Sequence, residues 1–274
     1  MIGCPAGSPL PRPATLTDER IEKTKAAARA VFGRRAGYYR KSPVHADPAV
    51  LARLVAMARP RPEWTALDLA TGAGHTALAL APHVRRVIGF DLTREMLAQA
   101  AALAREAGRP GLPLCQGDAH HLPFPSRSFD LVTCRRGAHH FADLPRALGE
   151  MRRLLRPGGR LVIDDRSVPE AAEAAELMNR LDRLHDPSHV REHSPRAWLE
   201  LLRDAGFAVE ETEPYEMLRP LHALTDGAEP QAAREIERLV DEMEPRVAEA
   251  FGRAGAKGNW SIRHWFVMLA ARPE

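Results

Sequence analysis

Two groups of residues in the central part of the chain have types and spacings that suit chemistry. His139 and His140 stand together after an apolar run, and a histidine can accept a proton near neutral pH. Gly72 and Gly74 lie in a glycine-rich turn, where the lack of a Cβ lets the backbone approach a ligand. Asp91 ends another apolar run about twenty residues later, a spacing at which an acid can accept hydrogen bonds from a ribose diol. These residues predict a nucleoside site with histidine bases beside it.

Positioning these residues requires strands that end at one edge of a sheet. Residues 64–70 form a short apolar run before the glycine turn, and a helical pattern over 75–82 follows at once. In an α/β fold this succession is a strand, a tight turn and a helix N-terminus whose free N–H groups can face a ligand. Residues 86–91 form the next strand, which completes a nucleoside-binding βαβ unit.

The alternation of strands and helices continues as far as residue 165. We expect helices at 94–107 and 144–155, strands at 112–116, 129–134 and 160–164, and a turn at 156–159. Alternation at this spacing is typical of a parallel, doubly wound sheet. The chain is therefore expected to have an α/β fold.

The two ends of the chain have different patterns. Residues 1–14 are rich in proline and glycine and are expected to form a loose tail. Residues 36–45 are polar and aromatic, break the helical periodicity, and either fold over the ligand or serve as a connector. The remaining elements are expected as helices at 17–32, 47–58, 170–184, 195–205 and 229–251, and as strands at 207–213 and 261–271.

The composition narrows the classes of function. With 274 residues, the chain is long enough for one α/β domain with an additional cap. The net charge is only +3, and no basic run is interleaved with aromatic residues, so no nucleic-acid partner is expected. The three cysteines are far apart and odd in number, which fits a reducing cytoplasm. Neither a secretory signal nor a membrane span is visible in the sequence.

Four motifs, in order along the chain, resemble those of class I S-adenosylmethionine (SAM) methyltransferases. The resemblance is to the ubiquinone/menaquinone-biosynthesis type, also called methyltransferase type 11. The first motif extends from Asp68 to Gly74, with Ala70 where this family often has glycine. The other three cover residues 122–132, 138–141 and 154–161.

This resemblance, which extends over about residues 65–213, implies both a fold and an activity. The fold would be a Rossmann-like, doubly wound, seven-stranded sheet of order 3-2-1-4-5-7-6, with strand seven antiparallel and with helical cap insertions. SAM would be the cofactor, and a methyl group would move to an O or C atom of a small-molecule acceptor. The implied division is an N-terminal tail and helical lid at 1–48, then a SAM-binding domain at 49–274 with insertions at about 168–205 and 226–256.

The same resemblance assigns residues to the cofactor. Gly72 would line the methionine and ribose, Asp91 would bind the ribose hydroxyls, and Asp118 would bind the adenine N6. Arg135 would face the amino-acid end of the cofactor, where this family usually has a small or polar residue. The full predicted cofactor set is Asp68, Ala70, Gly72, Gly74, Asp91, Leu92, Met96, Gly117, Asp118, Ala119 and Arg135.

Other residues are assigned to the acceptor. His139 and His140 are the predicted catalytic residues, with packing in the pocket as the alternative role. The many Leu and Met residues outside the motifs suggest an apolar acceptor. The predicted substrate-binding residues are Tyr38, Tyr39, His45 and His189.

Several alternatives remain open at the level of the sequence. The same cofactor motifs would serve a SAM-binding enzyme that catalyses a non-methylating reaction, such as a cyclase, an isomerase or a decarboxylase. They would also serve a non-catalytic SAM-binding protein, and a glycine-rich turn followed by an acid suits an NAD dehydrogenase as well. No metal is expected, because Pro187 interrupts the helix on which His185, His189 and His193 would otherwise be spaced as ligands.

Overall fold

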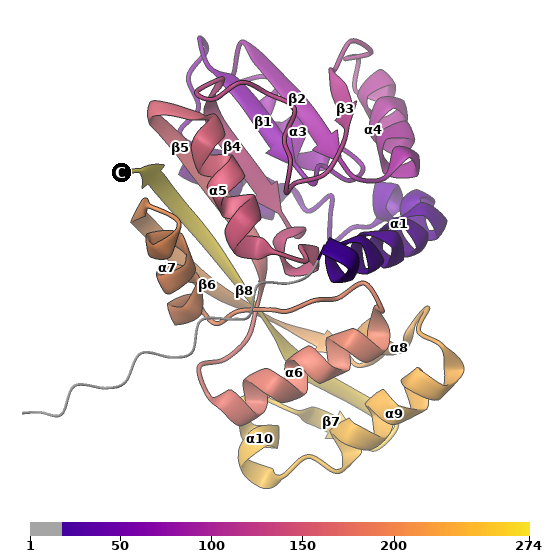
Figure 1. Cartoon of the computed structure of the whole chain (residues 1–274). Helices are drawn as coiled ribbons and strands as arrows, with labels where there is room; N and C mark the ends of the chain where they lie inside the picture. Colours follow the sequence, from indigo (N-terminus) through magenta and orange to yellow (C-terminus); the bar gives the residue numbers. More distant parts are fainter. Residues whose placement is uncertain (1–17) are drawn as a thin grey trace, which may run out of the picture.

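The centre of the protein is one mixed sheet flanked by helices (Figure 1). The computed structural model describes residues 18–274, so the tail expected at 1–14 lies outside the described residues. The strands lie in the order β3-β2-β1-β4-β5-β8-β6, and β7 pairs with β8 outside this path. Their bounds are β1 (Thr65–Leu69), β2 (Arg86–Asp91), β3 (Leu114–Gln116), β4 (Phe129–Arg135), β5 (Leu155–Ser167), β6 (Phe207–Pro220), β7 (Ala254–Ala256) and β8 (Asn259–Pro273).

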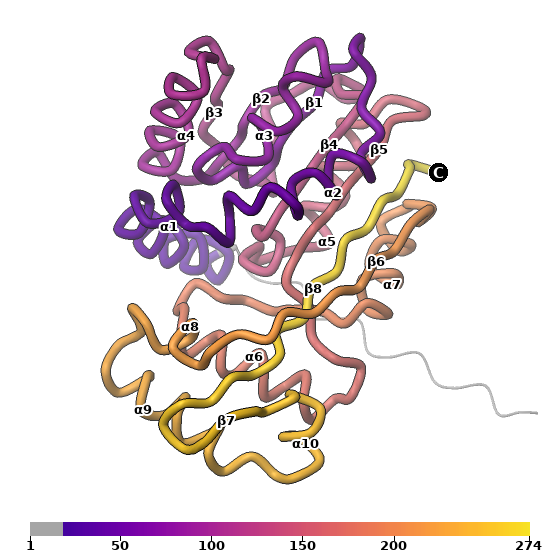
Figure 2. Tube along the Cα trace, turned by 180° about the vertical axis from the view of Figure 1, so that it is seen from behind, coloured from indigo at the N-terminus to yellow at the C-terminus, as the bar shows by residue number. Residues whose placement is uncertain are grey.

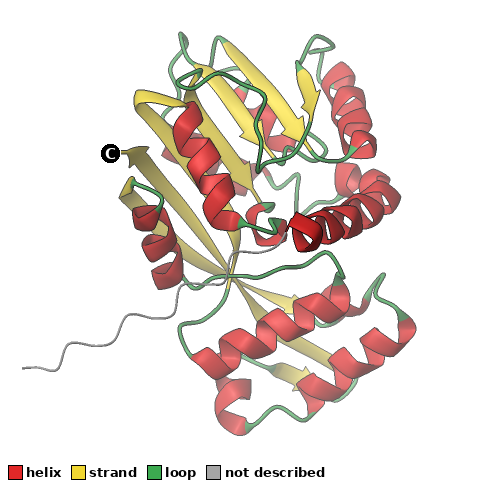
Figure 3. Cartoon of the chain, in the orientation of Figure 1, coloured by secondary structure: helices red, strands yellow, loops and turns green. Residues whose placement is uncertain are grey.

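Helices cover the sheet and extend beyond one end of it (Figure 3). None of those within residues 18–274 combines the length and the apolar character that a membrane span requires. The helices are α1 (Asp18–Lys41), α2 (Pro48–Ala58), α3 (His75–Leu80), α4 (Arg94–Glu106), α5 (Leu144–Leu154), α6 (Ala172–His185), α7 (Pro195–Asp204), α8 (His222–Thr225), α9 (Pro230–Asp241) and α10 (Pro245–Ala250), with a 3-10 turn at Ala138–His140.

The predicted strand order is confirmed. β1 to β5 are parallel to one another, and β8 is antiparallel to both β5 and β6, as expected of strand seven. The additional strand, β7, forms a hairpin with the start of β8. Gly258 lies in the turn of this hairpin with a φ of 83°, a conformation that favours glycine.

Both faces of the parallel part of the sheet are buried. Successive residues of a strand point to opposite faces. Leu131 of β4 belongs to a cluster with Leu54 of α2, whereas the next residue, Val132, belongs to a cluster with Leu148 of α5. The strands are therefore fixed between two layers of helices, which holds their carboxyl ends in place.

β6 and β8 continue beyond β5 and support a second group of helices, which we call the cap: α6, α8, α9 and α10 (Figures 1 and 2). β5 pairs with β8 only as far as Ser167, opposite Trp265, but β6 continues along β8 to Pro220. β6 is therefore longer than the strand expected at 207–213. A separate cluster of buried side chains, including Ile236 of α9 and Ile262 of β8, forms the core of the cap.

The turn expected at 156–159 is instead an irregular part of β5, where the pairing with β4 passes from Leu155 to Arg160. Two expected helix boundaries are also wrong. Residues 36–45 do not break the helix at their start, because α1 continues to Lys41. Pro43 is the first residue that cannot continue it, and a single glycine such as Gly37 costs a helix only about 1 kcal/mol. The single helix expected at 229–251 is two helices, α9 and α10, because Pro245 begins a new helix in its first turn.

Candidate active site

Two adjoining cavities lie at the carboxyl ends of the parallel strands. The inner cavity is bordered by the glycine-rich turn after β1, by the end of β2 and by the loop after β3. The outer cavity, of about 530 Å³, lies between α1, the 3-10 turn after β4, and the cap helices α6 and α8. The residues that line both cavities are Phe32, Tyr39, His45, Arg136 and His140.

Asp91 ties the end of β2 to the glycine-rich turn. Its Oδ2 accepts a hydrogen bond from the backbone N–H of Gly72 at 2.8 Å, and its Oδ1 accepts one from the N–H of Thr93 at 2.8 Å. Burial raises the pKa of Asp91, and these N–H groups oppose the shift. Each carboxylate oxygen has a further lone pair, so Asp91 can still accept from a ligand hydroxyl in the inner cavity.

Asp68 stands behind the glycine-rich turn and lines neither cavity. Its carboxylate accepts hydrogen bonds from the hydroxyl groups of Thr71 at 2.6 Å and Thr133 at 2.8 Å. Burial raises the pKa of Asp68 to about 6, although both hydroxyl groups act against this rise. Asp68 therefore joins the turn after β1 to β4. Gly74, with a φ of 88° at the start of α3, also lies outside both linings.

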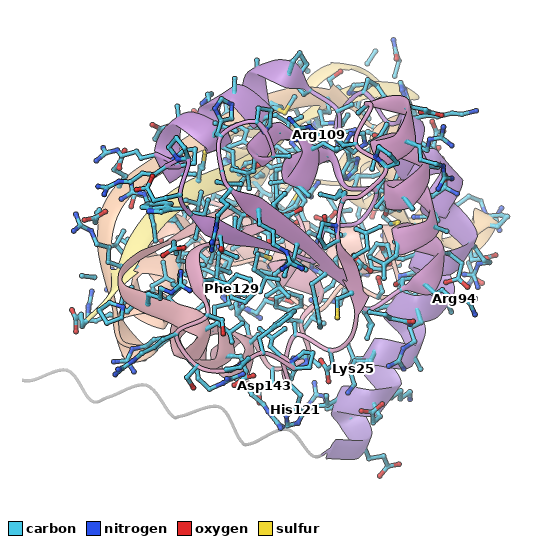
Figure 4. The ribbon with its side chains drawn as sticks, turned by 90° about the horizontal axis from the view of Figure 1, so that it is seen from above. Lys25, Arg94, Arg109, His121, Phe129 and Asp143 are labelled. Atoms are coloured by element: carbon cyan, nitrogen blue, oxygen red, sulfur yellow. The ribbon has the colours of Figure 1, made fainter. Side chains whose placement is uncertain are left out.

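Asp118, in the loop after β3, is held as an anion by groups from two directions. Its Oδ2 accepts from Nζ of Lys25 at 2.7 Å, and its Oδ1 accepts from the N–H of His120 at 2.9 Å. Burial acts to raise the pKa of Asp118, but the hydrogen bonds from Lys25 and His120 lower it to about 2. Lys25 extends from α1 on the side where His121 lies (Figure 4). The contact between Lys25 and Asp118 thus holds α1 against the loop after β3, at this end of the inner cavity.

Apolar side chains form walls between the two acids of the inner cavity. Leu92 and Met96 follow β2, and Ala119 follows Asp118 in the loop after β3. Gly117 is required for this arrangement, because a Cβ at this position would collide with the ring of Phe90. A flat apolar slot with polar groups at its ends suits a nucleobase and its ribose.

Arg135 approaches the inner cavity from the end of β4. Its Nε donates to the Thr76 hydroxyl at 3.0 Å, and its Nη2 donates to the backbone carbonyl of His45. Its Nη1 is buried and has no hydrogen-bond acceptor within residues 18–274. This donor can bind an anionic group of a ligand without breaking the other two hydrogen bonds.

A buried carboxylate orients the first of the two histidines after β4. Asp165 Oδ2 accepts from the backbone N–H of His139 at 2.9 Å, and Asp165 Oδ1 lies 2.5 Å from His139 Nδ1. Burial acts to raise the pKa of Asp165, but His139 holds it below its ordinary value. Because Nδ1 faces the carboxylate, Nε2 of His139 is the nitrogen left to act on a ligand.

His140 lies against His139, with 4.1 Å between the ring centroids. Its Nδ1 is 3.1 Å from the backbone oxygen of Ser188. A carbonyl oxygen only accepts, so this geometry assigns the proton to Nδ1 and leaves a lone pair on Nε2. Burial and the neighbouring His139 lower the pKa of His140 to about 4. His140 is therefore neutral at pH 7.

The four residues predicted to bind substrate are not all brought together. Tyr39 and His45 lie in the wall between the cavities, and Tyr38, 63% exposed, lines only the outer one. His189 lines neither cavity, and its Nε2 lies 3.0 Å from the Asn179 side-chain oxygen. Residues 18–274 contain no group of three or more His, Cys, Asp or Glu that could hold a metal.

Sequence reasoning missed several residues of the site. Lys25 and Phe32 come from α1, which carried no motif. Arg136 lines both cavities directly beside the predicted Arg135, at a φ of 51°. Asp165 had a signal in the sequence that was not used, because it is an acid that directly follows the fifth expected strand, 160–164.

Comparisons with known proteins agree with this geometry. Residues 67–163 match the family described as Methyltransferase domain. The uncharacterized methyltransferase YcgJ of Bacillus subtilis is 44% identical over 167 residues, which are 61% of this chain and 66% of YcgJ. The demethylmenaquinone methyltransferase of Thermus thermophilus is 46% identical over 99 residues, 35% of this chain and 44% of that protein. The aligned part thus spans two thirds or less of these curated relatives.

The solved structures extend the similarity over most of the chain. The crystal structure of YcgJ superposes with a TM-score of 0.77 at 32% identity, covering 82% of this chain and 98% of YcgJ. The protein BH2331 of Bacillus halodurans superposes with a TM-score of 0.79 at 32% identity, covering 82% of this chain and 99% of that chain. The chain belongs to the class I SAM-dependent methyltransferases, in the Methyltransferase domain family of type 11. Its cofactor is S-adenosylmethionine.

Proposed function

We propose that this enzyme transfers a methyl group from SAM to an O or C atom of a small-molecule acceptor bound in the outer cavity. The observation that carries the proposal is the common wall of the two cavities, formed by five residues that line both. Methyl transfer is an in-line displacement, so the cofactor and the acceptor have to meet at such a wall. The relative from Thermus thermophilus is likewise named for a small-molecule acceptor, demethylmenaquinone.

The inner cavity has the groups that SAM requires. Asp91 offers carboxylate lone pairs for the ribose hydroxyls, and the ionised Asp118 offers an acceptor for the adenine amino group. The unpaired Nη1 of Arg135 suits the carboxylate of the amino-acid end. When bound, SAM supplies a methyl group on a positive sulfur, so the protein needs no nucleophile of its own.

The two histidines are the proposed proton acceptors for the acceptor's hydroxyl or carbon acid. His140 lies in the common wall with an unprotonated Nε2, and His139 lines the outer cavity with its Nδ1 held by Asp165. A positioned base of this kind contributes about 10²- to 10⁴-fold to a rate. Asp165 Oδ1 lies beside Nδ1 of His139, which orients the ring and leaves Nε2 for the acceptor.

We assign α1 and the cap as the parts that enclose the acceptor. Phe32, Tyr38 and Tyr39 of α1 line the outer cavity from one side, and Asp182 and His185 of α6 line it from another. α1 lies within the proposed lid region 1–48, and α6, α9 and α10 of the cap lie within the proposed insertions at about 168–205 and 226–256 of the proposed domain 49–274.

The experiment that tests the proposal combines cofactor binding with product analysis. Purified protein is titrated in a calorimeter with SAM, S-adenosylhomocysteine (SAH) and NADH, and then incubated with SAM and a panel of phenols and carbon acids. We expect micromolar SAM and SAH binding, no NADH binding, and equal amounts of SAH and a product heavier by one methylene. Conversion of an acceptor without SAH formation would favour the non-methylating alternative and contradict the proposal.

A further inference from the structure

The outer cavity is lined by four arginines that come from four different parts of the chain. They are Arg35 of α1, Arg136 after β4, Arg166 of β5 and Arg219 of β6. Only Arg166 is neutralised, because its Nη2 is 2.5 Å from Asp182 Oδ2 and its Nε is 2.5 Å from Glu192 Oε1. The other three have no carboxylate oxygen within 4.0 Å among the described residues.

Arg136 has hydrogen-bonding capacity that the protein does not use. Its Nη1 donates to the backbone carbonyl of Val44 at 3.3 Å, whereas its Nε and Nη2 are buried without an acceptor in residues 18–274. The guanidinium lies over the ring of Phe266, 4.8 Å from the centroid. The Nε–Nη2 edge of a guanidinium is the edge that binds a carboxylate through two parallel hydrogen bonds.

Arg219 adds a second unneutralised charge to the same cavity. Its side chain forms no hydrogen bond or ion pair with any residue that the structure describes. Burial and the positive charges of Arg166 and Arg136 lower the pKa of Arg219. The same field acts on His45 in the common wall, whose pKa is lowered by burial and then by Arg136 and Arg135. Like charges held together in a half-buried place destabilise one another unless an anion lies between them.

The acids that line the outer cavity, all of them described residues, form no ion pair with Arg35, Arg136 or Arg219, although Asp186 is an anion that offsets part of their charge. Asp182 is paired with Arg166. Asp186 accepts from the N–H and the hydroxyl of Ser188, at 2.8 and 2.6 Å. Asp226 is exposed to solvent, where a charge is screened. The positive sulfur of SAM in the adjoining inner cavity would add to the same potential.

We infer that the acceptor is an organic acid, and that its carboxylate binds in the outer cavity between the guanidinium groups of Arg136 and Arg219. This inference rests on the proposed function, because it names the class of acceptor for the same site. It differs from the apolar acceptor expected from the sequence: the inferred acceptor has an anionic end for the arginines and a reacting end at the common wall. A cationic acceptor is disfavoured by the same charges.

The test compares acids with their neutral amides. SAH-loaded protein is titrated in a calorimeter with 4-hydroxybenzoate and 4-hydroxybenzamide, and with indole-3-acetate and indole-3-acetamide. We expect at least one acid to bind about tenfold more tightly than its amide, the effect of one charge-assisted pair. In Arg219→Gln and in Arg136→Gln the preference is expected to disappear. Arg219 lines only the outer cavity, so Arg219→Gln should bind SAH as the wild type does.

Matched controls separate charge in the cavity from charge on the protein as a whole. Arg196→Gln removes an arginine whose side chain is 80% exposed on α7, and it should keep the full preference for the acid. Should Arg136→Gln fail to fold, Arg219→Gln alone decides, because Arg219 has no partner to lose among the described residues. No acid preference in the wild type, no binding of either acid, or an unchanged preference in Arg219→Gln would overturn the inference.

A mass-spectrometric assay for methylated products distinguishes this inference from the proposed function. Methyl transfer to neutral phenols without any preference for acids would support the proposed function and contradict the inference. A preference for acids that depends on Arg219, without methyl transfer to any acceptor, would support a carboxylate site and contradict the proposed function.

Discussion

Gly137 packs so closely against Ala70 that a Cβ atom on Gly137 would lie 2.5 Å from the Ala70 Cβ. The turn after β4 and the turn after β1 therefore touch, and both border the inner cavity. Ala70 itself has a φ of 53°, a conformation that L residues adopt at a cost. The proposed cofactor site thus depends on close packing of two irregular segments that follow separate strands.

Gly137→Ala is expected to lower the free energy of unfolding by about 1–3 kcal/mol, because the added methyl group overpacks this contact. Urea denaturation monitored by circular dichroism measures the change. The matched control is Gly149→Ala in α5, where an added Cβ meets nothing within 4 Å. This control should stabilise the protein by about 1 kcal/mol, since alanine is the better helix former. Equal effects at the two positions would contradict the close-packing argument.

Asp91→Ala is expected to weaken the binding of SAH by about 1–3 kcal/mol, because buried N–H and hydroxyl groups lose their acceptor. The loss should be visible in a calorimetric titration. Asp47→Ala is the control: it removes another carboxylate that accepts backbone N–H groups, at the start of α2 and away from both cavities. It should reduce stability without reducing SAH affinity. An unchanged affinity in Asp91→Ala would exclude the ribose role.

His140→Ala is expected to reduce turnover about 10²-fold or more while leaving SAM affinity within a factor of about two, if His140 accepts the proton. Steady-state kinetics with the acceptor found by product analysis, together with SAM titration, separates the two effects. His83→Ala, an exposed histidine that lines neither cavity, serves as the control. Near-normal turnover in His140→Ala would assign the proton to the His139–Asp165 pair instead.

The low pKa of His140 also makes a prediction about stability. In the folded protein this pKa is about 4, against an ordinary value of 6.5. Between these values the unfolded chain binds a proton that the folded chain does not, so His140 favours unfolding as the pH falls from about 6.5 to 4. The stability of the wild type relative to His140→Asn should therefore drop by about 2 kcal/mol between pH 7 and pH 5. Urea denaturation at both pH values measures it, and a constant difference would contradict the buried, neutral histidine.

The alternating strands and helices could be predicted from the sequence. The alternation predicted a parallel sheet, the resemblance of the motifs to a known family implied the strand order, and the acid at the end of the second strand, Asp91, lies where such an acid was expected. The elements and this acid are local features, since each depends on residues within a single βαβ unit.

The contacts between distant segments could not be predicted in this way. The ion pair of Lys25 with Asp118 joins residues 93 positions apart in the sequence, and no motif within α1 predicts this pair. The continuation of α1 past Gly37 depends on packing, including that of Phe32 with Tyr39, whose ring centroids are 5.7 Å apart. The outer cavity is likewise formed by segments that share no sequence motif. Only the structure therefore shows that its arginines lie together.

The long ladder between β6 and β8, which has one register shift between Val209 and Glu211, has a mechanical consequence. Its pairing runs from Phe207, beside the main sheet, to Pro220, beneath the cap. From Glu211 to Pro220 the pairing is regular, so tilting the cap would break hydrogen bonds on both strands. We therefore expect the cap to stay in place and the proposed acceptor to enter on the side bounded by α1.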